Sequence, residues 1–468
     1  MANCLQEWPE PVVRVQALAE SGLAAIPSRY IKPPCQRPAA PLLGQEKELS
    51  ESEMSIPVID LGDLLLADDG GAATEAVAAA CREWGFFQVV NHGVRPELMR
   101  AAREAWRGFF RRPLPEKQRY ANSPRTYEGY GSRLGVQKGA ILDWGDYYFL
   151  HLAPEAAKSS DKYWPANPGN CKEVSEEYGR EVVRLCEVLM RVLSASLGLD
   201  ESHFQRAFGG AECGATLRAN YYPRCPQPDL TLGLSPHSDP GVLTVLLADE
   251  HVRGLQVRSP AGEWVTVQPV RDAFIVNVGD QIQILSMHST PPYVINSVFI
   301  PRVDFEPTLG LPAFLAAIFR ATRSNATTRS TTRAWAVSAI VCVVVWKRLH
   351  GVMHRQVHVT AREPATEINH HATSQQKGHA PILSNSIYKS VEHRVIVNAK
   401  EERISLALFY NPRADIPIAP APELVTAANR PALYPPMTYD EYRLFVRTKG
   451  TNGKAQIEAL KGQASPAS

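Results

Sequence analysis

A His-x-Asp pair at residues 237–239 is the first place in the chain where residue types and spacing could support chemistry. The pair stands in the sequence SPHSDP, residues 235–240. If this segment is one extended strand, the side chains of His237 and Asp239 point to the same face and could chelate one metal ion. Alone the pattern is weakly specific, because it is common by chance and also fits a solvated turn. A metal site therefore needs a third ligand.

The candidate for the third ligand is His393, in VEHRVIVN, where another strand is expected to begin. Two histidines and one carboxylate that leave three positions open form the ligand set of non-haem Fe(II) sites, whereas thiolate-rich sets favour zinc. Taken alone, His393 is better explained as a surface histidine at a strand start. Together, the three residues predict a site for Fe(II).

A cation and a hydroxyl follow on the next expected strand, in ERISLALFY. Arg403 and Ser405 are again separated by one residue and lie ten and twelve residues beyond His393. A guanidinium fork with a neighbouring hydroxyl can bind a carboxylate with two parallel hydrogen bonds. A buried arginine is costly unless an anion meets it. The pair therefore predicts an acidic co-substrate next to the metal.

The elements that must position these residues change character along the chain. Apolar periodicity predicts a buried strand at 85–90 and helices at 12–21, 73–84, 96–112, 174–197 and 439–448. After residue 214, short runs separated by Pro, Gly and Asp predict strands at 217–222, 242–248, 254–257, 264–267, 273–279, 393–398 and 403–412. Short strands at close spacing favour an antiparallel sandwich or barrel over alternating β-α units.

Composition excludes several classes of function. The 468 residues include 50 Lys or Arg and 48 Asp or Glu, so a broad basic surface for nucleic acid is not expected. Eight cysteines occur singly, without a CxxC pair, which argues against a zinc ribbon. No signal peptide is recognisable, and the apolar run 334–346 has 13 residues, against about 20 for a membrane span. We expect a cytoplasmic protein, with the nucleus as an alternative, that binds a small molecule and neither nucleic acid nor membrane.

Residues 287–384 differ from the rest of the chain. Ten Lys or Arg and four acidic residues give these 98 residues a net charge of +6, and seven of the 13 histidines lie here. No helical or strand period is sustained, and the sequence Ile-Leu-Ser stands at both edges, at 284–286 and 382–384. The segment is either a long surface insertion or sequence foreign to the fold, such as translated non-coding sequence. We expect it to be disordered.

Several ordered motifs carry a family resemblance. They are IPVIDL (56–61), WGFFQVVNHGV (84–94), NYYPRCPQPDLTLGLSPHSD (220–239), GLQV (254–257), VNVGDQIQILS (276–286), SNSIYKSVEHRV (384–395) and RISLALFYNP (403–412). In these motifs and their order, the chain resembles the plant Fe(II)- and 2-oxoglutarate-dependent dioxygenases, the group that contains anthocyanidin synthase and flavonol synthase. Segments 8–33, 123–152 and 433–450 resemble more closely the jasmonate-induced oxygenases, which hydroxylate jasmonic acid to its 12-hydroxy form.

The resemblance implies roles for the candidate residues. His237, Asp239 and His393 would hold Fe(II), with O₂ and 2-oxoglutarate as co-substrates and ascorbate as reductant. Arg403 and Ser405 would bind the distal carboxylate of 2-oxoglutarate, and the implied neighbours of that group are Tyr222 and Asn220. No side-chain general base is implied. His237 and His393 are 156 residues apart, and without 98 residues the spacing becomes 58, as the family expects.

The resemblance also implies a fold that is mainly β with flanking helices. Its core would be a double-stranded β-helix, the jelly-roll or cupin-like fold, beside an N-terminal α/β region. The predicted parts are an N-terminal arm (1–55), a mixed helical region (56–210), the core (211–286 and 385–415), the insertion (287–384), and a C-terminal helix and tail (416–468).

The implied activity is oxidative hydroxylation of a small carboxylic-acid hormone, jasmonic acid, within plant secondary metabolism. A flavonoid dioxygenase is the enzymatic alternative, and a member inactivated by the insertion is the non-enzymatic one. Arg218 shares a strand face with Asn220 and could pair with a substrate carboxylate, or it could form a surface ion pair. Tyr147, Tyr148 and Phe149 could line an apolar pocket or belong to the core. The oligomeric state is left open.

Overall fold

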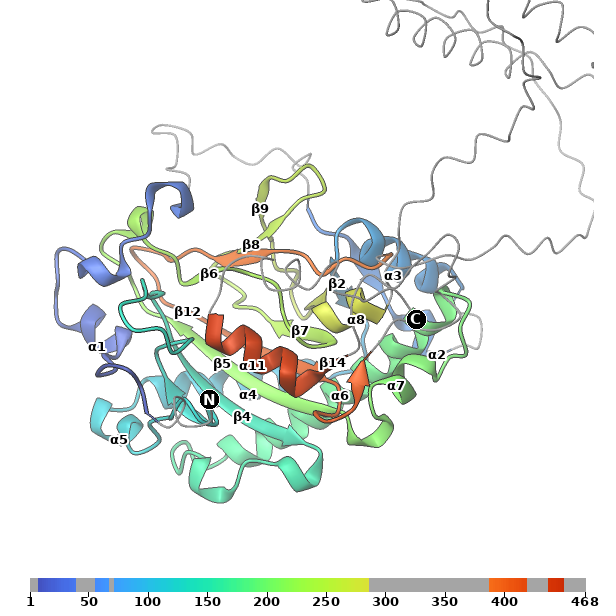
Figure 1. Cartoon of the computed structure of the whole chain (residues 1–468), viewed down its shortest axis with the longest axis horizontal. Coiled ribbons are helices and arrows are strands. Elements are labelled where there is room, and N and C mark those ends of the chain that lie inside the picture. The colour runs from blue at the N-terminus through green and yellow to red at the C-terminus, as the bar shows by residue number, and fades with distance from the viewer. Residues whose placement is uncertain (1–6, 39–54, 67–70, 286–386, 419–436, 450–468) are drawn as a thin grey trace, which may run out of the picture. The chain divides into compact units, whose positions relative to one another are not determined.

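The structure is a computed structural model that describes residues 7–38, 55–66, 71–285, 387–418 and 437–449 (Figure 1). All of them belong to one compact unit, made of residues 1–291 and 379–468. The predicted insertion and the apolar run 334–346 lie outside the described residues. Within the described part of the chain, no helix combines the length and the apolar character needed to cross a membrane.

Two sheets form the centre of this unit, and both are largely antiparallel, as the strand pattern predicted. The major sheet has the order β1-β2-β10-β7-β12-β5-β4-β3. Its strands are β1 (Val58–Asp60), β2 (Phe86–Val90), β3 (Gly129–Gly131), β4 (Asp146–Ala153), β5 (Gly214–Tyr222), β7 (Leu243–Leu247), β10 (Phe274–Val278) and β12 (Arg403–Asn411). The minor sheet has the order β6-β11-β8-β9. Its strands are β6 (Leu234–His237), β8 (Leu255–Arg258), β9 (Trp264–Thr266) and β11 (His393–Val395).

The described helices flank these sheets. They are α1 (Val15–Glu20), α2 (Gly62–Leu66), α3 (Gly71–Glu83), α4 (Pro96–Phe110), α5 (Leu114–Gln118), α6 (Cys171–Ser196), α7 (His203–Ala207), α8 (Asp280–Leu285) and α11 (Tyr439–Lys449). A short ribbon of β13 (Pro417–Ile418) and β14 (Met437–Thr438) precedes α11. The predicted mainly-β architecture with flanking helices is confirmed.

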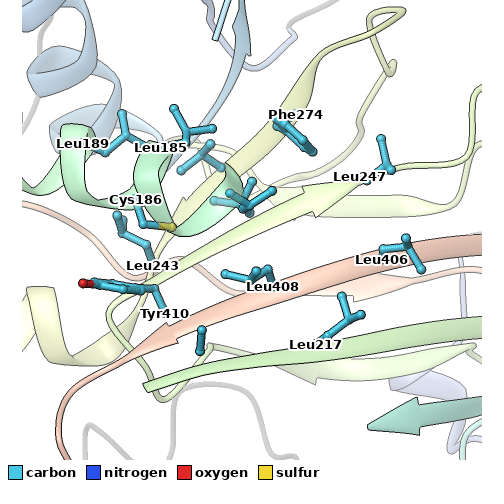
Figure 2. Close-up of a cluster of buried hydrophobic side chains, with 14 of the residues drawn as sticks. Leu185, Cys186, Leu189, Leu217, Leu243, Leu247, Phe274, Leu406, Leu408 and Tyr410 are labelled. Atoms are coloured by element: carbon cyan, nitrogen blue, oxygen red, sulfur yellow. The ribbon is translucent and has the colours of Figure 1, made fainter. Parts of the chain in front are cut away.

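Helix α6 covers one face of the major sheet. Figure 2 shows Leu185, Cys186 and Leu189 of α6 above Leu243 of β7 and Leu408 of β12. All five side chains are buried, and burying a leucine side chain contributes about 2 kcal/mol. The helix predicted at 174–197 is therefore confirmed, and its apolar side chains face the core.

Strict alternation on β5 and β12 divides their side chains between two environments. On β12, Ile404, Leu406, Leu408 and Tyr410 belong to the core under α6, while Arg403, Ser405, Ala407 and Phe409 line a cavity on the other face. On β5, Leu217, Ala219 and Tyr221 face the core, and Thr216, Arg218, Asn220 and Tyr222 face the cavity. Successive residues of a strand point to opposite faces, so one strand serves both core and site.

The described part of the N-terminal arm, residues 7–38, packs against the rest of the unit. The Asp146 carboxylate on β4 accepts hydrogen bonds from the backbone N–H groups of Val15 and Gln16, at 2.9 and 3.0 Å. The Tyr30 ring packs edge-on against Trp144, with 5.2 Å between centroids. The sequence of the arm does not reveal these contacts, because both partners lie more than 100 residues away.

Candidate metal and co-substrate site

His237, Asp239 and His393 converge at one end of the cavity. His237 is the last residue of β6 and pairs directly with His393, the first residue of β11. The Oδ1 atom of Asp239 lies 3.5 Å from Nε2 of His237 and 3.6 Å from Nε2 of His393. Their candidate ligand atoms all lie within 4.8 Å of one another. Among the described residues, no other set of three His, Cys, Asp or Glu side chains meets this criterion.

The placement of Asp239 differs from the expectation of a single strand. Strand β6 ends at His237, and Asp239 lies in the connection that follows, just before Pro240. Proline has no N–H group and cannot continue a ladder of hydrogen bonds. The backbone N–H of Asp280 donates to the Asp239 carbonyl at 2.8 Å and holds the connection in place. The two ligands share one side of the chain although only one of them is in the strand.

Hydrogen bonds fix the orientation of both imidazoles. Nδ1 of His237 lies 2.9 Å from the Ser235 carbonyl, and Nδ1 of His393 lies 3.2 Å from the Val391 carbonyl. A carbonyl only accepts hydrogen bonds, so Nδ1 carries the proton and Nε2 keeps its lone pair. In each case that lone pair is on the nitrogen nearest Asp239.

The electrostatics leave His393 and Asp239 in their metal-binding forms. Burial, with the adjacent His237, lowers the pKa of His393 to about 4, so its imidazole is neutral at pH 7. Burial alone would raise the pKa of Asp239, but the two imidazoles and the Thr244 hydroxyl outweigh it and hold the pKa below its usual range. Two imidazoles and one carboxylate fit a divalent metal such as Fe(II).

Arg403 and Ser405 form the second part of the site, on β12. Nη1 of Arg403 donates to Ser405 Oγ at 3.3 Å. The Arg403 side chain is buried, and its Nε has no hydrogen-bond partner among the described residues. Burial lowers the pKa of Arg403, and Tyr222 and Asp249 oppose that shift. A buried guanidinium with an unused donor is prepared to bind an anion.

Strand register brings the other two predicted co-substrate residues next to this pair. Tyr222 of β5 lies opposite Arg403, and Asn220 lies opposite Ser405. The Arg403 guanidinium sits 5.5 Å from the centroid of the Tyr222 ring. Burial raises the pKa of Tyr222, whose hydroxyl therefore stays protonated at neutral pH and can act as a donor. The four predicted residues thus form one wall of the cavity.

The cavity has a volume of about 240 Å³, and the candidate metal ligands and co-substrate residues all line it. Arg218 lies farther along the same face of β5. Its guanidinium stacks 4.3 Å from the centroid of Tyr147, and within the described part of the chain its Nε has no hydrogen-bond partner. Its position on the cavity wall does not agree with the alternative of a surface ion pair.

The aromatic patch at 147–149 divides between the two environments. Tyr147 and Phe149 line the cavity. Tyr148 points to the opposite face, where its ring lies 4.8 Å from Phe109 and 5.0 Å from Trp106 in the core. Pocket lining was therefore the correct interpretation for Tyr147 and Phe149, and core packing for Tyr148.

Two kinds of cavity residue were not predicted from the sequence. Phe409 continues the alternating series that begins with Arg403 and Ser405, so period-two counting could have identified it. Tyr439, Arg443 and Val446 come from α11, drawn in red in Figure 1, and also line the cavity. Arg443 forms an ion pair with Asp440 at 2.6 Å. No local pattern indicates that this C-terminal helix reaches the site.

Known proteins resemble the chain over nearly its full length. It is 46% identical to Jasmonate-induced oxygenase 1 of Arabidopsis thaliana over 454 residues, covering 97% of this chain and 87% of that protein. It is 31% identical to Flavanone 3-dioxygenase 2 of Oryza sativa subsp. japonica, covering 91% and 92%. A crystal structure of JOX2 in complex with 2OG, Fe and JA superposes with a TM-score of 0.70 at 47% identity, covering 97% of this chain and 99% of that one.

Two family models match the chain itself. The N-terminal model of non-haem dioxygenases in morphine synthesis matches residues 56–168. The model of the 2OG-Fe(II) oxygenase superfamily matches residues 213–294 and 350–412 and thus includes His237, Asp239, His393, Arg403 and Ser405. The unmatched residues 295–349 fall within the predicted insertion. The chain belongs to the 2OG-Fe(II) oxygenase superfamily.

Proposed function

We propose that this enzyme hydroxylates jasmonic acid to 12-hydroxyjasmonate with Fe(II), 2-oxoglutarate and O₂. The observation that carries the proposal is one cavity that joins a two-histidine, one-carboxylate set to two separate arginine positions, Arg403 and Arg218. In the overall reaction the substrate, O₂ and 2-oxoglutarate give the hydroxylated substrate, succinate and CO₂. One oxygen atom enters the substrate and the other enters succinate.

We assign the metal role to His237, Asp239 and His393, which would hold Fe(II) and leave coordination positions free for the co-substrates. Bound iron would supply the oxidising chemistry that protein side chains cannot. Arg403 and Ser405 bind the distal carboxylate of 2-oxoglutarate, and Tyr222 and Asn220 lie directly across the strand pair. These residues orient the co-substrate and exclude water from its charged end.

The substrate role is assigned to the outer part of the cavity. Arg218 stands there without a described anionic partner, and Arg443 of α11 lines the same cavity. A carboxylate that enters between them would gain charge-assisted hydrogen bonds. Phe149 and Phe409 provide apolar surface for the rest of a small acid. The resemblance to jasmonate-induced oxygenases supports jasmonic acid as that substrate.

A flavonoid is the second candidate, because a flavanone 3-dioxygenase is among the relatives. The cavity arginine Arg218 favours the acid. Flavonoids are neutral or weakly acidic phenols and would leave its guanidinium without a full countercharge.

A substrate panel tests the proposal. The purified full-length chain is incubated with Fe(II), ascorbate and 2-oxoglutarate, together with jasmonic acid, a flavanone or a dihydroflavonol. Succinate and hydroxylated product are measured in parallel. We expect iron-dependent 12-hydroxyjasmonate formation matched by succinate. Coupled turnover of a flavonoid alone would move the chain to the second candidate, and no iron-dependent succinate with any compound would indicate an inactive member.

A further inference from the structure

The second carboxylate oxygen of Asp239 is held by two donors that the sequence did not single out. The Thr244 hydroxyl donates to Asp239 Oδ2 at 2.6 Å, and the Asn277 amide donates to the same oxygen at 2.8 Å. All three side chains are buried, with 3% of Asp239, 5% of Thr244 and 3% of Asn277 exposed. The other oxygen, Oδ1, is the one that lies near both imidazoles.

The two donors belong to the major sheet. Asn277 of β10 and Thr244 of β7 are direct partners in the antiparallel register. Directly opposite side chains point to the same face of a sheet and lie about 5 Å apart. They can therefore meet one acceptor from two sides, as they do at Oδ2. Asp239 itself comes from the connection between β6 of the minor sheet and β7 of the major sheet.

The three candidate ligands are consequently fixed to different sheets. His237 and His393 belong to paired strands of the minor sheet, whereas Asp239 is fixed to the major sheet through Thr244 and Asn277. The hydrogen bonds from Thr244 and Asn277 therefore set the distance between the Asp239 carboxylate and the two imidazoles. The backbone around Asp239 alone would leave the side chain free to rotate about χ1 and χ2.

From this arrangement we infer that Thr244 and Asn277 are positioning residues that restrict Asp239 to binding the metal through Oδ1 alone. The inference rests on the proposed function. Coordination through one oxygen leaves three positions of an octahedral ion open, and a carboxylate that binds through both oxygens would occupy one of them. Because 2-oxoglutarate needs two positions and O₂ needs one, the pair keeps the site open for both co-substrates.

Removal of either donor should weaken metal binding. Partners that orient a metal ligand typically contribute 10–100-fold to metal affinity. Thr244→Val removes the hydroxyl at nearly constant volume, and Asn277→Leu removes the amide donor. We expect about a tenfold higher dissociation constant in each single variant and a larger increase in the double variant. Thr244→Ser keeps the donor and should bind metal like the parent.

The measurement is a titration of the metal-free full-length chain with Mn(II), followed by the electron paramagnetic resonance signal of the free ion, so that it does not depend on turnover. The matched control is Thr231→Val, because Thr231 is fully buried and its hydroxyl has no described partner. A second titration adds 2-oxoglutarate to the Mn-saturated proteins. We expect weaker 2-oxoglutarate binding in Thr244→Val than in Thr231→Val, because Asp239 can then use both oxygens.

The outcomes separate the inference from the function on which it rests. If Thr244→Val and Asn277→Leu bind Mn(II) as tightly as the parent and Thr231→Val, the positioning role is wrong while the metal site stands. If Thr244→Val and Thr244→Ser are weakened equally, the hydroxyl is not the cause and the inference also fails. If the parent binds no Mn(II), the proposed function fails together with the inference. Thermal midpoints of the metal-free variants identify any that are merely unfolded.

Discussion

His393 lies directly opposite His237 in the β6–β11 pair, with 4.2 Å between the centroids of the two rings. The two residues are 156 positions apart in sequence. On its other edge, β11 pairs with β8, where His393 faces Val257. Hydrogen bonds on both edges fix the position of His393. The register of three short strands therefore sets the positions of the two histidine ligands.

The first prediction concerns this pair. His393→Ala leaves two ligands, which cannot hold Fe(II) in a facial arrangement with three open positions. We expect loss of Mn(II) binding in titration and loss of succinate formation from 2-oxoglutarate, and the same for His237→Ala or Asp239→Ala. His203→Ala, at the start of α7, is the control and should behave like the parent. Retained metal binding in the His393 and Asp239 variants would show that these residues are not metal ligands.

The second prediction concerns the co-substrate. Arg403→Lys keeps a positive charge but loses the planar fork and its paired hydrogen bonds. One lost hydrogen bond to a charged group costs about 1.5–3 kcal/mol, so the apparent KM for 2-oxoglutarate should rise roughly 10–100-fold. Mn(II) affinity should not change. Arg103→Lys serves as the control, because Arg103 is equally buried but pairs with Glu250. If metal is lost while 2-oxoglutarate affinity is normal, Arg403 has another role.

The third prediction concerns the substrate carboxylate. Arg218→Met keeps a long apolar side chain and removes the charged guanidinium that stacks on Tyr147. We expect the KM for jasmonic acid to rise about 10–100-fold through loss of a charge-assisted interaction. The methyl ester should be a poor substrate for the parent, and the variant should lose the preference for the acid. Arg206→Met, which changes an exposed arginine of α7, is the control. An unchanged preference for the acid in Arg218→Met would refute the assignment.

Much of the site could be predicted because its chemistry follows local spacing. Arg403 and Ser405 are two residues apart on a strand, so period two placed them on one face. The same counting could have identified Phe409, but it could not assign a face to the run 147–149. There the sequence has three aromatic residues, and only packing against Trp106 and Phe109 shows that Tyr148 is the core residue.

Contacts that bridge distant segments lay beyond prediction. Asp239 is fixed by Thr244 and Asn277, which adjoin only because β7 and β10 pair in one particular register. Arg443 reaches the cavity because α11 docks there. The arm at residues 7–38 is packed because Asp146 binds the start of α1. Pairing and docking of this kind depend on the whole fold, and no spacing within one segment encodes them.

The fourth prediction concerns the effect of pH on stability. Burial lowers the pKa of His92 below 6.5, although the Asp272 carbonyl, 3.0 Å from its Nε2, opposes the shift. Its Nδ1 accepts a hydrogen bond from the Val94 N–H at 3.2 Å, and protonation would break that bond. Below about pH 6.5 the unfolded chain binds a proton that the folded chain resists, so stability falls as pH falls.

His92→Asn isolates this contribution. The asparagine carbonyl can still accept from Val94, and it does not titrate. We expect a lower thermal midpoint than the parent at about pH 8, because the contact to Asp272 is lost, and a smaller fall between about pH 7.5 and about pH 5.5. Thermal melts of the metal-free proteins across this range measure both effects. Parallel curves for parent and variant would show that His92 does not contribute to acid sensitivity.

The last prediction concerns the segment 287–384. Two described residues on either side of this segment contact each other: the backbone N–H of Ser390 donates to the Gln283 side chain at 2.9 Å. In the full chain, 106 residues separate Gln283 from Ser390. In a shortened chain that joins Ser286 directly to Asn385, eight residues separate them. Eight residues easily connect two residues that touch. Loop-closure entropy over this difference favours the shorter chain by roughly 2 kcal/mol, provided that the segment adds no stabilising contacts.

We therefore expect the shortened chain to melt a few degrees higher and to form succinate at least as fast as the full chain, with Asp239→Ala inactive in both backgrounds. A shortened chain that is insoluble or inactive, beside an active full chain, would mean that residues 287–384 are part of the fold.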